Sequence, residues 1–251
     1  MQNVLNALRA LEEIAALQPV GVGDLARAME LPKSTVQRTL GTLSEAGWIR
    51  QAEGTPTRWV LTTRALVVGR RASGELGLRD VAVPVMERLR SHVDETVHLA
   101  VPEGERVILV ERLETSRPVR IVLPLGQQLP GHASANGKAI LAARPDGDVE
   151  RYIAAGLADF TDTTLTDPER LRAELRAIRA RGYATNGGEW RSDVSAVAAA
   201  VLGAHGLPVA SISVNVPTSR MTPELSADLG ARVAAAAKEV GGALEHLRQT
   251  P

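Results

Sequence analysis

The sequence contains no cysteine and few aromatic residues, and each absence excludes a class of protein. Without cysteine the chain has no disulfide framework, no thiolate nucleophile and no sulfur-ligated metal. Aromatic residues make up only 2% of the 251 residues, which argues against binding of single-stranded nucleic acid by base stacking. No apolar run approaches the roughly 20 residues that cross a bilayer, and no signal peptide precedes the first amphipathic segment. We therefore expect a soluble cytoplasmic protein with no membrane partner.

The chain also lacks net charge, because its 29 basic residues are matched by 29 acidic ones. No global field then attracts nucleic acid, and any such attraction must be local. Residues 1–73 carry nine basic and six acidic side chains, a small positive excess. A DNA-binding protein with so little excess charge is expected to gain affinity by dimerisation. The hydrophobic content of 44% is sufficient for the cores of two modest domains.

One segment, residues 31–49, has the pattern of a helix that contacts something outside the protein. Pro32 suits a first helical position, and Val36, Leu40 and Leu43 form one narrow apolar stripe. The opposite side has no carboxylate among its residues, which are Ser34, Gln37, Arg38, Gly41 and Thr42. Lys33 and Thr35 flank this side. Arginine pairs with guanine, glutamine pairs with adenine, and hydroxyls and lysine suit phosphate, so these residues predict a helix in the DNA major groove.

The flanking segments place this helix in a winged helix-turn-helix. Residues 22–29 have the pattern of a preceding helix, and residues 30–32 form a tight break. Residues 48–61 alternate as a β-hairpin, with Arg50 and Arg58 near its tip as further DNA contacts. On periodicity alone, the alternative is an ordinary solvated amphipathic helix beside a hairpin.

The rest of the sequence predicts a linker and a second domain. Val4, Leu8 and Ile14 predict a helix over residues 3–17 that packs under the helix-turn-helix. We expect a DNA-binding domain over 1–73, a linker helix over 74–92 and an effector domain over 93–251. Pro84 should kink or restart the linker helix. The apolar surface of this helix favours a subunit interface, in a homodimer or alternatively a tetramer.

Alternating runs predict the strands of the second domain, and longer amphipathic runs predict its helices. The expected strands are 96–101, 106–111, 119–123, 194–202 and 208–216. Helices are expected near 137–143, after Asp148, from Pro168 to Gly182 and after Thr222. This order describes an α+β fold with a mainly antiparallel sheet.

Enzymatic and metal chemistry find little support. The loop from Gly131 to Ala139 resembles a phosphate-binding loop but has one residue too many between its glycines. It also has Ala139 where magnesium-bound Ser or Thr is required. Ser134 or Asn136 is equally suited to capping the next helix. The five histidines are scattered, so we expect no metal site, no catalytic residues and no cofactor, and His98 is interpreted as a hydrogen-bonded core or edge residue.

Residues 31–49, which contain the predicted major-groove helix, and four later segments together resemble one family, the IclR-type bacterial transcriptional regulators. The matching segments are LPKSTVQRTLGTLSEAGWI, WVLTTRALVVG, LPGHASANGKAILA, RGYATNGGEW and AAAVLGAHGLPVASISVNVP. They span nearly the whole chain in the order of the family. The resemblance implies a sequence-specific regulator of double-stranded operator DNA, in which a GAF-like domain binds a small-molecule effector.

The resemblance also implies the effector contacts, between the sheet, the HASANGK loop and the RGYATNGGE loop. The residues at those positions are Ile121, Ala135, Asn136, Asn186, Ala196, Ser213 and Asn215. The chain departs from the family pattern at several of them, since members often have an acid at Asn186 and small residues at Asn136 and Asn215. A glycine is also usual at Asp193, and an arginine at Asn6. The amides predict a neutral pocket for a polar ligand with a carboxylate or several hydroxyls on a small apolar body.

Two other functions are consistent with parts of the sequence. One is an enzyme with an accessory DNA-binding domain, which would require a nucleophile and a base in the pocket. The other is a dimerisation module fused to a DNA-binding domain that senses no ligand. The asparagine-rich pocket favours a ligand-binding regulator over both.

Overall fold

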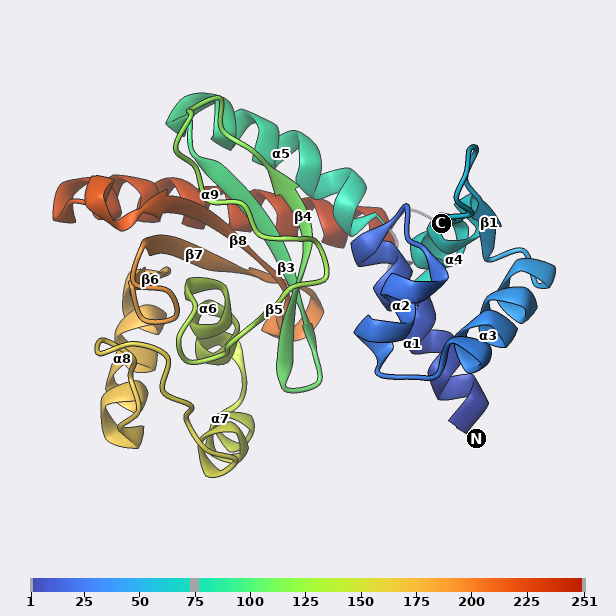
Figure 1. The fold of residues 1–251 in the computed structure, drawn as a ribbon. Helices are drawn as coiled ribbons and strands as arrows, with labels where there is room; N and C mark the ends of the chain where they lie inside the picture. The colour runs from blue at the N-terminus through green and yellow to red at the C-terminus, as the bar shows by residue number, and fades with distance from the viewer. Residues whose placement is uncertain (1, 73–76, 250–251) are drawn as a thin grey trace. The chain divides into compact units, whose positions relative to one another are not determined.

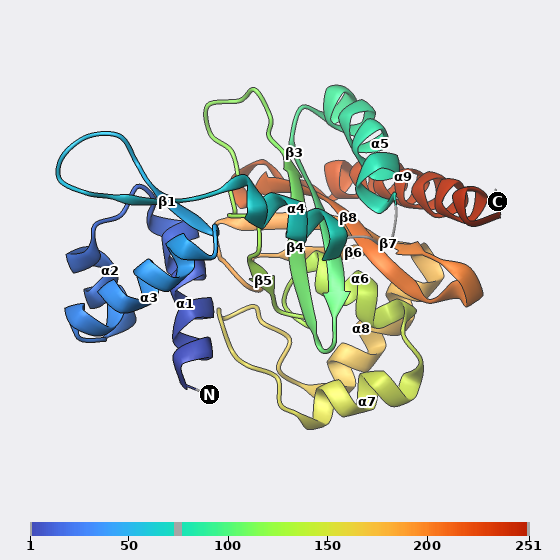
Figure 2. The ribbon, with the colours of Figure 1, turned by 90° about the vertical axis from the view of Figure 1, so that its right-hand side faces the viewer.

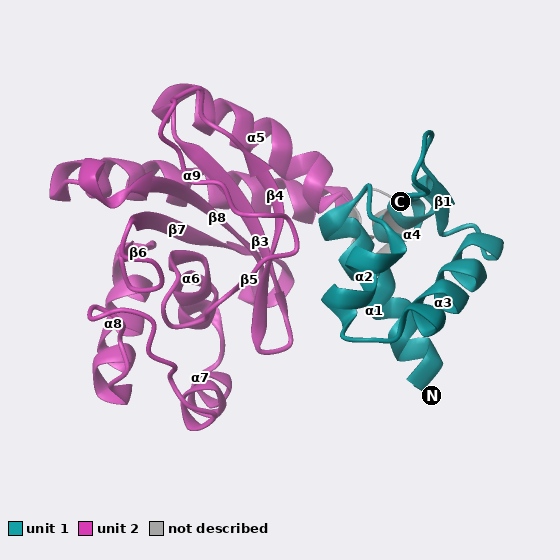
Figure 3. Cartoon of the chain, viewed as in Figure 1, with its two compact units in different colours: residues 1–76 teal, residues 77–251 magenta. Residues whose placement is uncertain are grey.

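The structure, a computed structural model, describes residues 2–72 and 77–249. The chain divides into two compact units, residues 1–76 and residues 77–251, drawn in two colours in Figure 3. Each unit has its own hydrophobic core. We describe the units one at a time.

Unit 1 is a helical domain with a small hairpin. Its elements are α1 (Gln2–Leu17), α2 (Val22–Met29), α3 (Lys33–Glu45), β1 (Ile49–Gln51), β2 (Trp59–Leu61) and α4 (Thr63–Ala72). The two strands pair antiparallel, with Ile49 opposite Leu61. The N–H of Trp59 also donates to the carbonyl of Val20 at 2.8 Å, which ties the hairpin to the chain between α1 and α2. The predicted winged helix-turn-helix is confirmed.

The turn between α2 and α3 sets the angle of the second helix. Glu30 ends α2 in the left-handed conformation with φ of 56°, and the N–H of Leu31 bonds back to Ala26 at 3.1 Å. Pro32 is still extended, with ψ of 139°, so α3 begins at Lys33, one residue later than predicted. Val36, Leu40 and Leu43 are buried in the core of unit 1.

The packing of α1 differs from the prediction at two residues. Ala10 and Ile14 are completely buried, whereas Val4 and Leu8 are 65% and 53% exposed. The expectation that Val4 and Leu8 pack under the helix-turn-helix is therefore wrong. The buried stripe of α1 is formed by Asn6, Ala10 and Ile14, which leaves a second apolar face on the surface.

Unit 2 is built on one six-stranded sheet. Its elements are α5 (Leu78–Val93), β3 (Thr96–Glu103), β4 (Arg106–Leu113), β5 (Gln128–Leu129), α6 (Ala135–Ala143), α7 (Asp146–Ala154), α8 (Pro168–Arg181), β6 (Ala184–Gly187), β7 (Val194–Leu202), β8 (Pro208–Pro217) and α9 (Pro223–Gln249). The strand order is β5-β4-β3-β8-β7-β6, and every neighbouring pair is antiparallel. The predicted α+β class is confirmed.

Helices cover both faces of this sheet. Along one face lie α5 and α9, whose apolar residues share a core with Val97 and Leu99 of β3 (Figure 1). On the other face α6, α7 and α8 pack around Ala196 and Ala198 of β7, as the turned view also shows (Figure 2). The helix predicted as a linker thus packs within unit 2 from Leu78 onward.

Two local predictions for unit 2 are wrong. Residues 119–123 form no strand, because side chains of Arg220 and Arg112, rather than a neighbouring strand, donate to the carbonyls of Val119 and Leu123. Residues 184–187, expected in a loop, form the edge strand β6. A single helix runs through Pro84, so of the two predicted effects the helix does not restart there, and the kink stays a prediction. Within the described residues, no helix is long and apolar enough to cross a membrane.

Candidate functional sites

The first candidate site is the outward side of α3. Lys33, Ser34, Gln37, Arg38 and Thr42 are exposed, and Thr35 is half-buried. The hydroxyl of Thr42 donates to the carbonyl of Arg38 at 3.2 Å. Among the described residues, neither Gln37 nor Arg38 has a side-chain hydrogen bond or ion pair. Both remain available to a partner that offers paired donors and acceptors.

The two predicted wing residues, Arg50 and Arg58, are also exposed, but their side chains differ in how they are hydrogen-bonded. The Arg58 guanidinium donates to the carbonyl of Pro19 at 3.0 Å, and this bond holds the side chain of Arg58 against the body of unit 1. The Arg50 guanidinium makes only a longer contact, 3.3 Å, with the neighbouring Gln51 carbonyl. The hairpin therefore presents two cations without a carboxylate partner in the described part of unit 1.

The second candidate site is a small cavity in unit 2, between the sheet and the start of α6. Its volume is about 20 Å³, close to that of a single water molecule. Strand register builds its floor: Asn186 of β6, Ala196 of β7, Asn215 of β8 and Thr96 of β3 are direct neighbours in one row. Neighbours in such a row point to the same face of the sheet.

The structure brings together most of the residues implied by the resemblance. Ala135, Asn136, Asn186, Ala196 and Asn215 line the cavity. The two others lie behind it: Ser213 accepts a hydrogen bond from the Asn215 amide at 2.9 Å, and Ile121 belongs to an adjoining apolar cluster. The cavity is also lined by residues that sequence reasoning did not select, namely His98, Leu123, Leu129, Ser134, Trp190, Arg191 and Val194.

Two of the asparagines are held in fixed orientations. The Asn186 side-chain oxygen accepts the N–H of Glu189 at 2.8 Å, so its NH₂ group is left for the cavity. The Asn136 NH₂ donates to the Ser211 hydroxyl at 2.9 Å, so its oxygen is left as an acceptor. One side of the site thus offers a donor and the other an acceptor.

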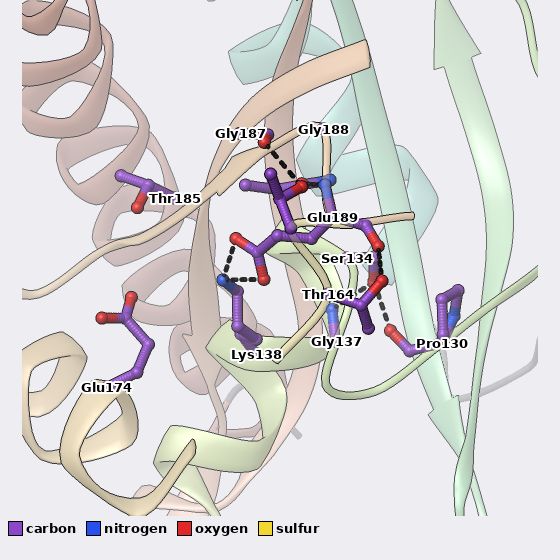
Figure 4. Close-up of polar contacts among 12 residues, drawn as sticks. Pro130, Ser134, Gly137, Lys138, Thr164, Glu174, Thr185, Gly187, Gly188 and Glu189 are labelled. Atoms are coloured by element: carbon purple, nitrogen blue, oxygen red, sulfur yellow. Dashed lines mark hydrogen bonds and ion pairs between the residues drawn. The ribbon is translucent and has the colours of Figure 1, made fainter. Parts of the chain in front are cut away.

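A buried ion pair holds the turn that follows β6, the strand that carries Asn186. The Lys138 ammonium, on α6, lies 2.6 and 2.7 Å from the two carboxylate oxygens of Glu189 (Figure 4). The Thr164 hydroxyl donates to the carbonyl of Glu189 at 2.6 Å. Burial raises the pKa of Glu189, and the positive charge of Lys138 opposes that rise. Lys138 is ion-paired with Glu189. The segment from Gly131 to Ala139 therefore lacks the free lysine that a phosphate-binding loop requires.

The neighbouring polar groups have structural roles. The Ser134 hydroxyl accepts the N–H of Gly137 at 3.0 Å and caps α6, as one of the two sequence interpretations proposed. The His132 ring is fixed between the Tyr152 hydroxyl and the Ala158 carbonyl, each at 2.8 Å. Burial lowers the pKa of His132. In the part of the chain that the structure describes, no group of three or more His, Cys, Asp or Glu side chains is placed to hold a metal.

His98 differs from its sequence interpretation. It is 1% exposed, yet neither ring nitrogen has a hydrogen-bond partner in the described structure. Burial lowers its pKa to about 3, and the Arg112 cation on the next strand contributes. The imidazole is therefore neutral. Only strand register, which pairs β3 with β8, could have placed His98 beside the asparagines.

A larger hollow of about 230 Å³ lies elsewhere on unit 2. It is lined mainly by alanines and other apolar residues, and its Arg179 guanidinium is already bound to the Ala142 carbonyl at 2.6 Å. Two further surface hollows are larger still, about 380 and 360 Å³, so volume does not single out a site. We favour the smaller cavity, because polar groups converge there and some of them have no partner.

An exposed helix face without acids from Lys33 to Thr42 on one unit and a small polar cavity on the other are the features of a ligand-responsive DNA-binding protein. The family model for the IclR helix-turn-helix domain matches residues 3–53, and the model for the bacterial transcriptional regulator IclR C-terminal domain matches residues 71–241. The chain belongs to the IclR family of bacterial transcriptional regulators.

Individual relatives agree with this assignment. The chain is 32% identical to the transcriptional repressor IclR of Escherichia coli, over 96% of this chain and 89% of that protein. An IclR homologue from Microbacterium hydrocarbonoxydans, complexed with 4-hydroxybenzoate, is 26% identical with a TM-score of 0.82, covering 97% and 99% of the two chains. Thermotoga maritima IclR is 25% identical with a TM-score of 0.83, covering 98% and 100%. The chain is thus a DNA-binding transcriptional regulator modulated by an effector, and not an enzyme.

Proposed function

We propose that each subunit places α3 in the major groove of its operator, with Ser34, Gln37 and Arg38 at the base edges. The observation that carries this proposal is the division of α3, whose apolar stripe is buried while its outward side is exposed and carries no acid from Lys33 to Thr42; the exposed Glu45 lies only at the end of the helix. Lys33, Thr35 and Thr42 would contact phosphates at the edges of the groove. Arg50 and Arg58 of the wing would bind the backbone or the minor groove.

The proposed active form is a homodimer in the cytoplasm, with a tetramer as the alternative. One DNA-binding domain covers one half of the operator, and the positive charge of unit 1 is small. Two linked DNA-binding domains are therefore needed for high affinity for the operator. Unit 1 also exposes two apolar strips that suit a subunit contact, Val4, Leu5 and Leu8 on α1 and Leu66, Val67 and Val68 on α4. Exposed apolar strips of this kind usually mark a surface that another protein or subunit covers.

The proposed effector site is the cavity lined by Asn136, Asn186 and Asn215, and the proposed ligand is a small carboxylate or hydroxylated compound. The ligand in the Microbacterium relative, 4-hydroxybenzoate, is of this kind. Side chains of β3 alternate between the two faces of the sheet, so His98 lines the cavity while Val97 and Leu99 pack with α5. A ligand that moves β3 would therefore move α5, the helix that leads back toward unit 1.

The relatives named as repressors favour repression as the output of this chain. Effector binding would then alter the spacing of the two DNA-binding domains and release the operator. Such release requires that the ligand bind the two arrangements with different affinity.

The test begins with selection of duplexes from a random-sequence pool by the full chain. We expect enrichment of a sequence with two-fold symmetry, and loss of that enrichment in a Gln37→Ala, Arg38→Ala double variant. Arg176→Ala, an exposed arginine on α8, is the control for loss of one positive charge. Recovery of the same sequence by the double variant would contradict the proposed reading helix.

A further inference from the structure

The cavity beside the asparagines is too small for the class of ligand proposed for it. Its volume of about 20 Å³ is that of one water molecule, and a ring-bearing acid is several times larger. Protein interiors are closely packed and have few voids that could absorb the difference. Part of the cavity wall must therefore move before such an effector can enter.

The wall consists of segments that are held in different ways. Most lining residues lie on strands or at the start of α6, where backbone hydrogen bonds fix them. In the described structure, two lining segments lie outside these elements. One is the turn 188–193, with Trp190 and Arg191, and the other is the segment 118–125, which contributes Leu123. We call residues 118–125 the covering segment.

The turn is held by its backbone and by buried side chains. The N–H of Gly188 donates to the carbonyl of Val194 on β7 at 3.1 Å. The carboxylate of Glu189 is paired with the buried Lys138, and its carbonyl accepts the Thr164 hydroxyl. Movement of this turn would break all of these bonds.

The covering segment is held by side chains instead. Among the described residues, none of its backbone groups bonds to the backbone of a neighbouring strand or helix. The Arg220 guanidinium donates twice to the carbonyl of Val119, at 3.1 Å each, and the Arg112 guanidinium donates to the carbonyl of Leu123. An ion pair of Arg120 is partly exposed and contributes little. Two arginine side chains therefore hold this part of the wall.

Both ends of the covering segment are fixed. Before it, the Arg117 guanidinium donates to the carbonyl of Asp94 at 3.0 Å. After it, the N–H of Gly126 donates to the carbonyl of Leu109 at 2.8 Å. The residues between these two points can move while the ends stay in place.

Few side chains of the covering segment are buried. Ile121 and Leu123 are 8% and 5% exposed and belong to the apolar cluster beside the cavity, and every other residue of the segment is exposed. Leu123 itself lines the cavity. Outward movement of the segment would thus open the wall by withdrawing two side chains from one cluster.

We propose that residues 118–125 are the entrance gate of the cavity, and that Arg220 and Arg112 hold this gate shut. The inference rests on the proposed effector site and adds the route by which a ligand reaches it. Opening is a local transition of the folded chain, which is common where few buried contacts and no backbone ladder hold a segment.

The absence of cysteine allows a test with single introduced thiols in the full chain. Ala196→Cys places a thiol in the cavity, and Val233→Cys places one in the core on the other face of the sheet. Alkylation by iodoacetamide without ligand is followed by mass spectrometry. Global unfolding exposes both thiols equally, so a gate should make position 196 react at least about tenfold faster than position 233.

Variants made in the Ala196→Cys chain then identify the wall that moves. Arg220→Gln should raise the rate at position 196 by about 10- to 100-fold, because it removes hydrogen bonds of a charged group, and Arg112→Gln should act in the same direction. Thr164→Val weakens the turn, which stays closed when the gate opens, so it should leave this rate almost unchanged.

A second comparison covers the loss of stability that Arg220→Gln could cause. Arg220 also donates to the buried Glu95 carboxylate at 2.8 Å, which the substitution leaves without this partner. The rate at position 196 is therefore also compared between Glu95→Gln and the Glu95→Gln, Arg220→Gln double variant, in which no carboxylate is left unpaired. The same increase is expected.

Three results would overturn the gate: equal rates at positions 196 and 233, no increase with either arginine variant, or an increase with Thr164→Val that matches the increase with Arg220→Gln. Alkylation in the presence of 4-hydroxybenzoate and a panel of small carboxylic acids separates this inference from the proposed effector site. If the arginine variants act as expected but no acid slows the reaction at position 196, the gate stands and the effector site is wrong. If an acid slows the reaction while the arginine variants have no effect, the gate is wrong and the effector site stands.

Discussion

The Lys138–Glu189 ion pair gives the sharpest prediction for stability. The Lys138 side chain is 1% exposed and that of Glu189 12%, and the charged atoms lie 2.6 Å apart. At an effective dielectric constant of about 20, two unit charges at this distance attract by about 6 kcal/mol, although desolvation offsets part of it. Removal of one partner leaves the other charge buried, so Lys138→Met or Glu189→Gln should each reduce the free energy of unfolding by about 3–5 kcal/mol.

A double-mutant cycle separates the pair from its surroundings. The Lys138→Met, Glu189→Gln double variant carries neither charge and should cost at least about 2 kcal/mol less than the sum of the single variants. Arg232→Gln, which breaks an exposed pair with Asp228 on α9, is the control and should leave unfolding almost unchanged. Urea unfolding can be followed by Trp190 fluorescence in a Trp48→Phe, Trp59→Phe background, since those two residues lie in unit 1.

The pH dependence of one single variant provides a second check. Burial raises the pKa of Glu189, and Lys138→Met removes the charge that opposes this rise. A carboxyl whose pKa is higher in the folded than in the unfolded state stabilises the fold below its unfolded pKa, and this contribution is lost as pH rises through the folded pKa. The cost of Lys138→Met should therefore be larger at pH 8 than at pH 5. Additive single costs, or single costs below about 1 kcal/mol, would refute the argument.

Three further predictions concern the subunit contact, the wing and the buried histidine. Leu8→Glu adds charge to an exposed apolar strip and should yield a folded monomer by light scattering; a wild-type chain that is already monomeric at micromolar concentration would contradict the proposed dimer. Arg50→Ala and Arg58→Ala should each lower the salt dependence of operator binding by about one phosphate contact per half-site, and an unchanged slope would exclude the wing. Because burial lowers the pKa of His98 from 6.5 to about 3, the unfolded chain binds its proton first, so stability is full above pH 6.5 and falls as pH drops toward 3. In His98→Leu, the free energy of unfolding should fall by up to about 1.4 kcal/mol less per pH unit than in the wild type. A pH dependence of the urea midpoint that is the same in both proteins would contradict this prediction.

Local periodicity explains why unit 1 could be predicted closely. Val36, Leu40 and Leu43 lie within two turns of one helix, so their spacing alone determines which side of α3 is buried. The same reasoning failed for Val4 and Leu8, because an apolar stripe on a helix does not reveal whether its own domain or another subunit covers it.

The site in unit 2 depended on contacts that sequence spacing does not encode. The resemblance supplied Asn136, Asn186 and Asn215, but Thr96 and His98 joined them only through the pairing of β3 with β8. Lys138 and Glu189 are 51 residues apart, and nothing in the local pattern joins them. Residues 119–123 alternate like a strand, yet two arginine side chains, not a strand, bind their carbonyls. These are long-range effects that a single sequence does not show.

The central claim is that the outward side of α3 reads DNA sequence, and Arg38 tests it most directly. Binding of wild type and Arg38→Ala should be measured by fluorescence anisotropy against the selected operator and every single-base variant of it. We predict that Arg38→Ala loses about 1–3 kcal/mol on the operator and loses discrimination at one base pair of each half-site. A uniform loss over all sequences would make Arg38 a phosphate contact, and an unchanged affinity would contradict the claim that α3 is the reading helix.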